Sequence, residues 1–418
     1  MKTGFALSES FHNKIDHYPD IIKFHLTTLF NEIIKLSTEN LYSIVLIGST
    51  ARNELSYFFL DEKIDIHGDY EFILVFKIKP KQCELLKLKN LFNRLEEEWN
   101  IKSPLFSIDY GAYSINRLKL LPKTLWLFEL LKFGILVYGN KIDEFLPKSI
   151  SYKNIDKGNL KHLILVRLWN TYKYLNTNYI NNVNTDYELR VIKHIYARNV
   201  LDVLTVLLPH KNILHAGYGK RNEIFQNLEI NCEWNNLKKE INACYLLKVD
   251  INNLDMNLDY SKTFINSFEL LINEIFNIDF KKNKSKLTSK QPFDESLYQK
   301  LRWKLLDFKY LWHLRQFNLR SFSLIRKDRI RKNLILVLLL IHKSIVAKNK
   351  KEKLSHIKEA YKYVNKIDNQ FKYDKIMKFD ESFFLLRKKL NKIFIKHFYG
   401  LSNLKISDLN GINNWSRK

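Results

Sequence analysis

The feature that most constrains the fold of this chain is a pair of apolar stretches with small or acidic residues at their adjoining ends. The stretch LYSIVLI runs into Gly48-Ser49, and about twenty residues later a second apolar stretch begins with Asp69-Tyr70-Glu71. Apolar runs rich in β-branched and aromatic residues predict β-strands, so we expect strands over residues 41–47 and 70–78. Alternate side chains of a strand point to the same face, and Asp69 and Glu71 should therefore project together.

Two neighbouring carboxylates suggest a cation site. Ionised carboxylates on one face repel each other unless a cation lies between them, and Mg²⁺ prefers oxygen ligands, commonly one or two carboxylates plus substrate phosphates. Asp109 lies in a third expected strand, residues 105–113. If that strand is the neighbour of the second, Asp109 joins the same face, and three carboxylates can then form a two-metal site for phosphoryl or nucleotidyl transfer. The alternative is a solvated strand end with ordinary surface carboxylates.

Gly48 and Ser49 provide the features of a phosphate-binding turn. A small-residue turn between a strand and a helix exposes backbone N–H groups and a helix N-terminus, which both favour phosphate. Glycine allows close backbone approach, and the Ser49 hydroxyl can donate a hydrogen bond to a phosphate oxygen. Arg52, one turn further on, either reaches the same phosphates or faces solvent.

This segment resembles the nucleotidyltransferase superfamily that includes DNA polymerase β and kanamycin nucleotidyltransferase. The matching positions are Gly48, Ser49, Asp69, Glu71 and Asp109, and FELLKFGILVYGN (128–140) resembles the end of the catalytic domain in small bacterial members. The likeness covers roughly residues 20–145. Two features depart from it: the interval from Ser49 to Asp69 is longer, so that YFFLDEKIDIHG would be an insertion beside the site, and the second carboxylate is Glu rather than the commoner Asp.

The resemblance implies an enzyme that transfers a nucleoside monophosphate from an NTP, such as ATP, to an unidentified acceptor and releases pyrophosphate. Asp69, Glu71 and Asp109 would be catalytic and would hold Mg²⁺ or Mn²⁺. Gly48, Ser49 and Arg52 would bind the nucleotide. The alternative is a catalytically inactive protein of the same fold that acts by binding.

Periodicity predicts an α+β protein with three domains. A small mixed sheet with helices over 20–39, 82–99 and 122–134 and a last strand over 135–139 would form a catalytic domain (1–150). Strand signals fade after residue 158, so we expect a helical domain (151–280), a Lys-rich linker (281–292) and a basic helical domain (281–418). Few glycines and prolines, 11 and 7 in 418 residues, agree with long helices.

Charge is segregated along the chain. Residues 1–280 contain 34 Lys and Arg against 33 Asp and Glu, a net charge of +1, whereas residues 281–418 contain 35 against 11, a net charge of +24. A single basic segment, with cationic runs at 325–332 and 348–353, predicts an anionic partner. Nucleic acid and an anionic membrane surface both fit.

The remaining features predict a cytoplasmic protein, with peripheral membrane attachment as the alternative. Cys83, Cys232 and Cys244 show no paired spacing and are expected to be free thiols. The N-terminal residues lack the apolar core of a signal peptide. The longest apolar run, residues 334–341, is too short to span a bilayer and is expected to be a buried helix.

Overall fold

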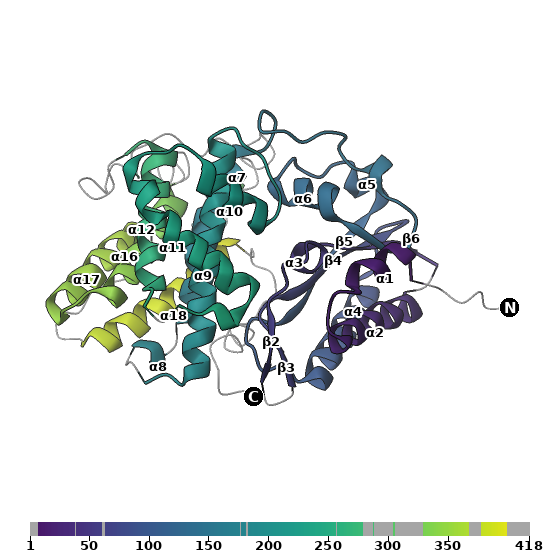
Figure 1. Cartoon of the computed structure of the whole chain (residues 1–418), viewed down its shortest axis with the longest axis horizontal. Coiled ribbons are helices and arrows are strands. Elements are labelled where there is room, and N and C mark those ends of the chain that lie inside the picture. The colour runs from purple at the N-terminus through teal and green to yellow at the C-terminus, as the bar shows by residue number, and fades with distance from the viewer. Residues whose placement is uncertain are drawn as a thin grey trace. The chain divides into compact units, whose positions relative to one another are not determined.

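The computed structural model of the chain, shown in Figure 1, describes residues 7–37, 39–60, 63–175, 177–180, 183–255, 257–278, 287, 304–305, 329–367 and 378–398. Its contacts divide the chain into two compact units. Unit 1 contains Met1–Ile155, Asn212–Arg221 and Leu246–Leu254, and unit 2 contains Asp156–Lys211, Asn222–Tyr245 and Asp255–Lys418. The linker predicted over 281–292 lies outside the described residues, Leu287 apart.

Unit 1 is built on a mixed sheet of four strands in the order β5-β4-β1-β6. The strands are β1 (Leu41–Leu46), β4 (Asp69–Phe76), β5 (Ser107–Ser114) and β6 (Ile135–Gly139). Strand β1 pairs antiparallel with β4 and with β6, whereas β4 pairs in parallel with β5. The predicted strands and the predicted α+β class are thereby confirmed, and β5 is the neighbour of β4.

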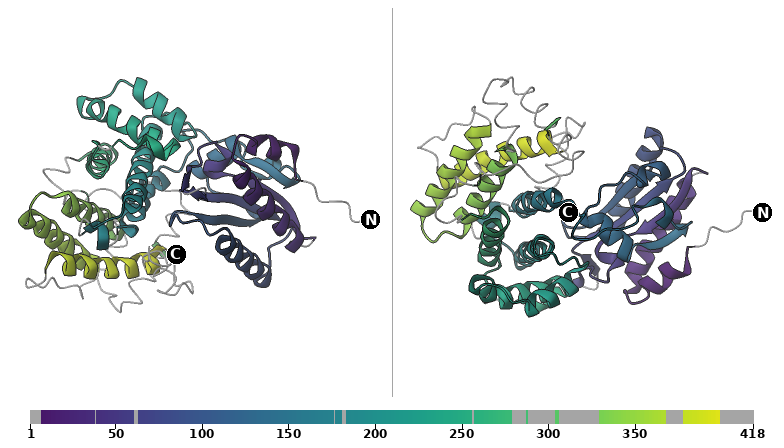
Figure 2. Two further views of the ribbon diagram at one scale, coloured as in Figure 1. Left: turned by 60° about the horizontal axis from the view of Figure 1, so that its bottom comes forward. Right: turned by 90° about the horizontal axis from the view of Figure 1, so that it is seen from above.

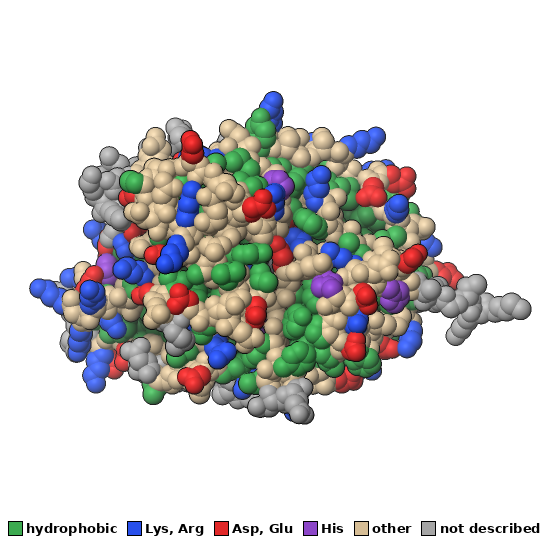
Figure 3. All heavy atoms as spheres, viewed as in Figure 1, with side chains coloured by type: hydrophobic (Ala, Val, Ile, Leu, Met, Phe, Trp, Pro, Cys, Tyr) green, Lys and Arg blue, Asp and Glu red, His purple; other side chains and the backbone are tan. Residues whose placement is uncertain are grey.

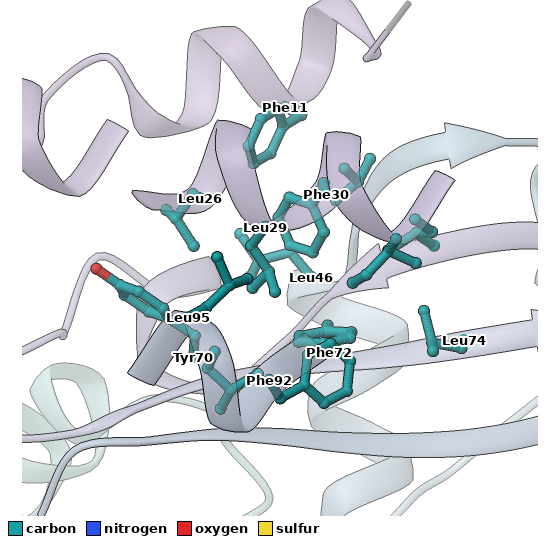
Figure 4. Packing of buried hydrophobic residues seen from close by; sticks show 14 of the residues in the cluster. Phe11, Leu26, Leu29, Phe30, Leu46, Tyr70, Phe72, Leu74, Phe92 and Leu95 are labelled. Carbon is teal, nitrogen blue, oxygen red and sulfur yellow. The ribbon is translucent and has the colours of Figure 1, made fainter. Parts of the chain in front are cut away.

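The two faces of this sheet are covered by different helices. Phe72 and Leu74 of β4 point into a core formed with α1 (Glu9–Ile15), α2 (Asp20–Leu36) and α4 (Gln82–Trp99), as Figure 4 shows. Ile73 and Val75 point the other way, into a second core with α5 (Ile115–Leu118) and α6 (Leu125–Phe133). Because strand side chains alternate, Asp69 and Glu71 lie on the face that carries α5 and α6.

The segment expected as an insertion folds as a β-hairpin, β2 (Tyr57–Leu60) with β3 (Lys63–Ile66). It is anchored at its base: the buried carboxylate of Asp65 accepts hydrogen bonds from the Ser103 amide (2.7 Å) and lies 3.1 Å from Nε2 of His67. Lys248, from the third segment of unit 1, is also buried here, and its Nζ donates to the Ser56 hydroxyl (2.7 Å). This insertion is therefore an integral part of unit 1.

Two short 3₁₀ helices and a set of α-helices complete the described elements. The 3₁₀ helices are Asp143–Phe145 and Ile251–Asn253, and α3 is Gly48–Ala51. The helices after residue 155 are α7 (Lys157–Lys173), α8 (Thr177–Ile180), α9 (Asp186–His210), α10 (Tyr218–Asn227), α11 (Cys232–Val249), α12 (Tyr260–Phe276), α16 (Arg329–Val346), α17 (Lys350–Ile367) and α18 (Phe379–Phe398). The first residues of α10 and the last of α11 belong to unit 1.

Unit 2 is helical and contains residues from both of the helical domains that the sequence predicted. Helix α16 packs against α7 and α12 and lies beside α17, which can be followed in both views of Figure 2. A ring nitrogen of His342 in α16 lies 3.2 Å from the Leu168 carbonyl oxygen of α7, and both groups are buried. The described helices on either side of residue 280 thus share one packed unit.

The described residues of the two cationic runs in the basic segment differ in their burial. Residues Leu334–Ile341 of α16 are fully buried, as expected, and in the same helix Arg331 and Lys332 are buried as well. Arg329, the remaining cation in the described part (329–332) of the run 325–332, is partly buried, whereas Lys348, Lys350 and Lys351 of the run 348–353 are exposed. Among the helices that the structure describes, none has the length and apolarity needed to cross a membrane.

Candidate functional site

Asp69, Glu71 and Asp109 share one face of the sheet, which we call the carboxylate face. Asp69 and Glu71 are two residues apart on β4, and Glu71 is aligned with Asp109 in the parallel pairing of β4 with β5. Neighbouring strands are about 5 Å apart, so the strand backbones bring all three carboxylates into one neighbourhood. Asp69 and Glu71 are partly buried and Asp109 is exposed, so the set is reached from solvent on the β5 side.

Burial and neighbouring negative charges raise the pKa of two of these groups, Glu71 and Asp109. Burial, followed by the charges of Asp69 and Asp109, raises the pKa of Glu71 to about 7, against a smaller opposing effect of the Trp126 hydrogen bond. Desolvation and then the Asp69 charge also raise the pKa of Asp109. A solvated strand end would leave carboxylates near their ordinary values, so Glu71 at least is not an ordinary surface carboxylate.

Two aromatic side chains, Trp126 and Tyr113, also lie on this face, and neither was predicted from the sequence. Indole Nε1 of Trp126 in α6 donates to Oε1 of Glu71 (3.2 Å), and the rings of Trp126 and Tyr113 lie 6.1 Å apart between centroids. Burial, with smaller contributions from Asp109 and Glu71, raises the pKa of the Tyr113 phenol. The periodicity of α6 alone marks Trp126 as an ordinary core residue, and only the β4–α6 contact reveals its hydrogen bond.

The Gly48 turn lies directly against Glu71. Gly48 has φ +71°, a left-handed conformation, and a Cβ atom built there would lie 2.5 Å from Oε2 of Glu71. Any other residue would meet both the backbone strain and the carboxylate. Ser49 follows immediately and is partly buried, so the predicted phosphate turn and the predicted metal carboxylates are contiguous.

The helix that follows the turn is shorter than the sequence argument assumed. Helix α3 contains only the four residues Gly48–Ala51, and the Ser49 carbonyl accepts the amides of Arg52 (3.2 Å) and Glu54 (2.8 Å). The macrodipole of an α-helix is a sum over aligned peptide units. A single turn contributes little to phosphate binding, so backbone N–H groups and the Ser49 hydroxyl are the remaining candidates in this turn.

Arg52 neither faces solvent nor has an uncommitted guanidinium. Its side chain is 8% exposed; Nε donates to Glu54 (2.8 Å) and Nη1 donates to Glu129 of α6 (3.0 Å). Burial alone would lower the pKa of Arg52, but Glu129 and Glu54 raise it above its ordinary value. The structure thus gives Arg52 a role in the interior of unit 1, and its predicted contact with phosphate stays untested.

Glu129 connects Arg52 to a distant segment of unit 1. Nη2 of the buried Arg221 also donates to Glu129, and Nε of Arg221 donates to the His215 carbonyl (2.9 Å). The guanidinium of Arg52 lies over the Tyr218 ring at 5.7 Å. We call Arg52, Glu54, Glu129 and Arg221 the arginine–glutamate network. It fixes α6, which carries Trp126, to the loop after the Gly48 turn and to residues 212–221.

The residues of the carboxylate face fit a divalent cation in kind. Carboxylate oxygens are the ligands that Mg²⁺ and Mn²⁺ prefer. Burial and the charges of Asp69 and Asp109 raise the pKa of Glu71, and Gly48 leaves the space beside Oε2 of Glu71 free of a side chain. Within the described residues, however, no three His, Cys, Asp or Glu side chains are already gathered closely enough to hold a metal ion. The three carboxylates therefore lie on one face of the sheet but are not close enough together to form a complete set of metal ligands.

Comparison of the chain with family models, with curated proteins and with solved structures found no match. The resemblance to nucleotidyltransferases accordingly rests on the motif residues alone.

Proposed function

We propose that this chain is a metal-dependent nucleotidyltransferase that moves a nucleoside monophosphate from an NTP to an acceptor hydroxyl and releases pyrophosphate. The observation that carries the proposal is the contact of Glu71 with the Gly48 turn on a face that also contains Asp69 and Asp109. A phosphate-binding turn and a cluster of mutually repelling carboxylates are adjacent, as a metal–triphosphate complex requires.

The three carboxylates differ in their exposure to solvent, and we assign them different roles on that basis. Asp69 and Glu71, on the strand next to the Gly48 turn, would hold Mg²⁺ or Mn²⁺; the bound ion would neutralise charge on the triphosphate. Trp126 keeps Glu71 oriented through its hydrogen bond to Oε1, which leaves Oε2 directed at the turn.

Asp109 is the candidate general base. It is the exposed member of the set, and its raised pKa makes it a stronger base than an ordinary aspartate. It would take the proton from the acceptor hydroxyl while a bond forms from the acceptor oxygen to the α-phosphorus. The bond from that phosphorus to pyrophosphate breaks in the same step. Catalysis is then chiefly positioning and charge neutralisation.

The Gly48 turn would bind the triphosphate. Close approach of the Gly48 backbone and donation from the Ser49 hydroxyl are the contacts available in the turn. Arg52 is not assigned to this role, because its guanidinium is already paired with Glu54 and Glu129.

The free thiols of Cys83, Cys232 and Cys244 support a reducing, cytoplasmic setting for the reaction.

The decisive experiment is label transfer with the full chain. Purified protein is incubated with cell lysate, Mg²⁺ or Mn²⁺, and each of the four NTPs labelled on the α-phosphate or, separately, on the γ-phosphate. Transfer of the α-label only supports nucleotidyl transfer, whereas transfer of the γ-label identifies phosphoryl transfer and refutes the proposal. Asp69→Asn should lose at least about 10³-fold of the activity, because metal clamping contributes several kcal/mol to the transition state.

A matched control removes an exposed carboxylate from the same unit. Glu97 lies on the surface of α4, and Glu97→Gln should retain full labelling. Equal labelling by the Asp69 and Glu97 variants would show that the carboxylate face does not carry the reaction.

A second candidate function is supported by the absence, among the described residues, of a gathered set of three metal ligands. In this alternative the fold is catalytically inactive and only binds a nucleotide or phosphate group at the Gly48 turn. It predicts saturable NTP binding, measured by calorimetry with and without Mg²⁺, together with no transfer of α-label from any NTP.

A further inference from the structure

The outer face of helix α17 carries a stripe of lysines. Lys351, Lys358 and Lys362 are exposed, and Ser355 occupies the exposed position between the first two. Their separations of four, three and four residues put all four positions on one side of an α-helix. We call Lys351, Lys358 and Lys362 the lysine stripe. Figure 3, which has the viewpoint of Figure 1, shows Lys and Arg side chains gathered over α17.

The opposite face of α17 is firmly packed within unit 2. Ile357, Tyr361 and Val364 are buried against neighbouring helices, and the Tyr361 hydroxyl donates to the Ser382 carbonyl of α18 (3.0 Å). Lys353 is directed to the Phe379 ring of α18, at 5.6 Å. The apolar face is thus already used for folding, and the lysine stripe is held on a rigid helix.

The acidic residues of α17 offset only part of this charge. The helix contains six lysines and two glutamates, and Glu352, one of the two, lies 3.8 Å from Nε2 of His356 on the same helix. Neither glutamate falls at a position of the stripe. The outer face of α17 therefore keeps a positive field that its own residues do not cancel.

The character of this surface favours a nucleic acid duplex over a membrane or a single strand. An interfacial helix inserts an apolar face into the bilayer, but the large hydrophobic side chains of α17 are not among the exposed ones. Binding of single strands relies on bases stacked on accessible aromatic rings, whereas Tyr361 and Tyr363 are buried. What remains is regularly spaced positive charge, which suits a phosphate backbone.

We propose that the lysine stripe of α17 docks the sugar–phosphate backbone of a nucleic acid duplex, without reading its sequence. The stripe extends over the twelve residues from Lys351 to Lys362, which is about 17 Å at a rise of 1.5 Å per residue. A DNA duplex presents one negative charge per roughly 1.7 Å of its axis, so about ten phosphates pass alongside the stripe. The surface lies within unit 2 and uses none of the residues of the carboxylate face.

The proposal is tested by salt-dependent binding of the full chain to a 20-base-pair DNA duplex, measured by fluorescence anisotropy from 50 mM to 300 mM KCl. The triple variant Lys351→Gln, Lys358→Gln, Lys362→Gln should lower the slope of log K against log salt by about 2.7, that is 0.9 for each lost phosphate contact. If binding at 1 M salt is unaffected, affinity at 0.1 M salt falls by about 500-fold. Glutamine has nearly the helix propensity of lysine, so α17 should remain folded, as circular dichroism will show.

The control removes three exposed lysines from unit 1, Lys77, Lys87 and Lys89. This variant has the same net charge as the triple stripe variant and should bind the duplex within threefold of the wild type. Two duplexes of unrelated sequence should bind equally, and the stripe variant should retain NTP binding and α-label transfer at the wild-type level, which separates this proposal from the proposed activity.

Four results would overturn the proposal: a stripe variant that loses less than tenfold in affinity, a control variant that loses as much as the stripe variant, a wild-type chain that prefers a single strand of equal length, and a chain that binds anionic phosphatidylserine vesicles but no duplex. The last of these would assign the surface to a membrane.

Discussion

Replacement of Glu71 by Gln should stabilise unit 1 while abolishing transfer, and the size of the effect follows from the charge cluster. The pKa of Glu71 is raised from 4.5 to about 7 by burial and by the neighbouring carboxylates. Each pKa unit corresponds to 1.36 kcal/mol, so ionised Glu71 destabilises the folded state by about 3 kcal/mol. Glutamine has the same shape, carries no charge and can still accept the Trp126 hydrogen bond.

The sign of the pH dependence makes this prediction specific. Because the folded-state pKa is raised, the folded protein binds more protons than the unfolded chain between pH 4.5 and 7, and its stability falls as the pH rises through that window. Below about pH 4.5 Glu71 is neutral in both states, and wild type and Glu71→Gln should have equal stability. Above pH 7 the variant should be more stable by about 3 kcal/mol.

The measurement has to report on unit 1 within the full chain. Urea titrations are made at pH 4.5 and pH 8 in the presence of a chelator, and a short hydrogen-exchange pulse followed by mass spectrometry reads the unfolding of the peptide that contains β4. Glu97→Gln, which removes an exposed carboxylate, should change the unfolding free energy by less than about 0.5 kcal/mol. Two results would refute the electrostatic argument. One is a difference in unfolding free energy between Glu71→Gln and wild type that is the same at pH 4.5 and pH 8. The other is a variant that is less stable than wild type at pH 8.

Three further predictions concern the same unit. Mg²⁺ at pH 8 should raise the urea midpoint of the wild type but not that of Glu71→Gln, and equal shifts in both would place the ion elsewhere. Ser49→Ala should weaken NTP binding by about 1–2 kcal/mol in calorimetry, the size of a charge-assisted hydrogen bond. Gly48→Ala should weaken NTP binding by more than Ser49→Ala does, because of the positive φ at Gly48 and the contact with Glu71. Undiminished NTP binding by both variants would exclude the turn as a phosphate site. Glu129→Gln should destabilise unit 1 by about 3–5 kcal/mol, since it removes the carboxylate paired with the buried Arg221 and one of the two carboxylates paired with Arg52; a loss below 1 kcal/mol in urea unfolding would mean that the network is not structural.

Local patterns in the sequence predicted the sheet and the site strands well, for a physical reason. Alternation and apolar runs report which residues a strand buries, and each of the four strands expected between residues 41 and 139 became a strand of the main sheet. Glu71 and Asp109 were expected on one face only if their strands were neighbours, because sequence does not show which strands pair. The structure places them opposite each other in the β4–β5 register. The β2–β3 hairpin was missed because β2 has only four residues and charged residues alternate with isoleucines in β3.

Interactions between distant parts of the chain were beyond the reach of such patterns. Glu129 accepts hydrogen bonds from Arg52, 77 residues away, and from Arg221, 92 residues away, and no local pattern indicates either contact. Arg331 and Lys332, taken as part of a cationic surface, are buried in α16. Periodicity assigns a residue to a face of its own helix, but the identity of the element that covers that face is a property of the tertiary fold.

The two charged clusters of unit 1 differ in how their charges are balanced, and this difference supports the proposed position of the divalent cation. In the arginine–glutamate network two arginines meet two glutamates, and every recorded contact joins opposite charges. On the carboxylate face three acidic groups adjoin, and Arg52, a cation whose charge lowers the pKa of Glu71, is already shared between two glutamates of the network. Buried charge that serves stability alone is normally balanced by a partner from the same chain. The carboxylate face departs from that rule beside a glycine that keeps the adjoining space clear of side chains, so the free energy of its repulsion is available to a divalent cation and the phosphates that arrive with it.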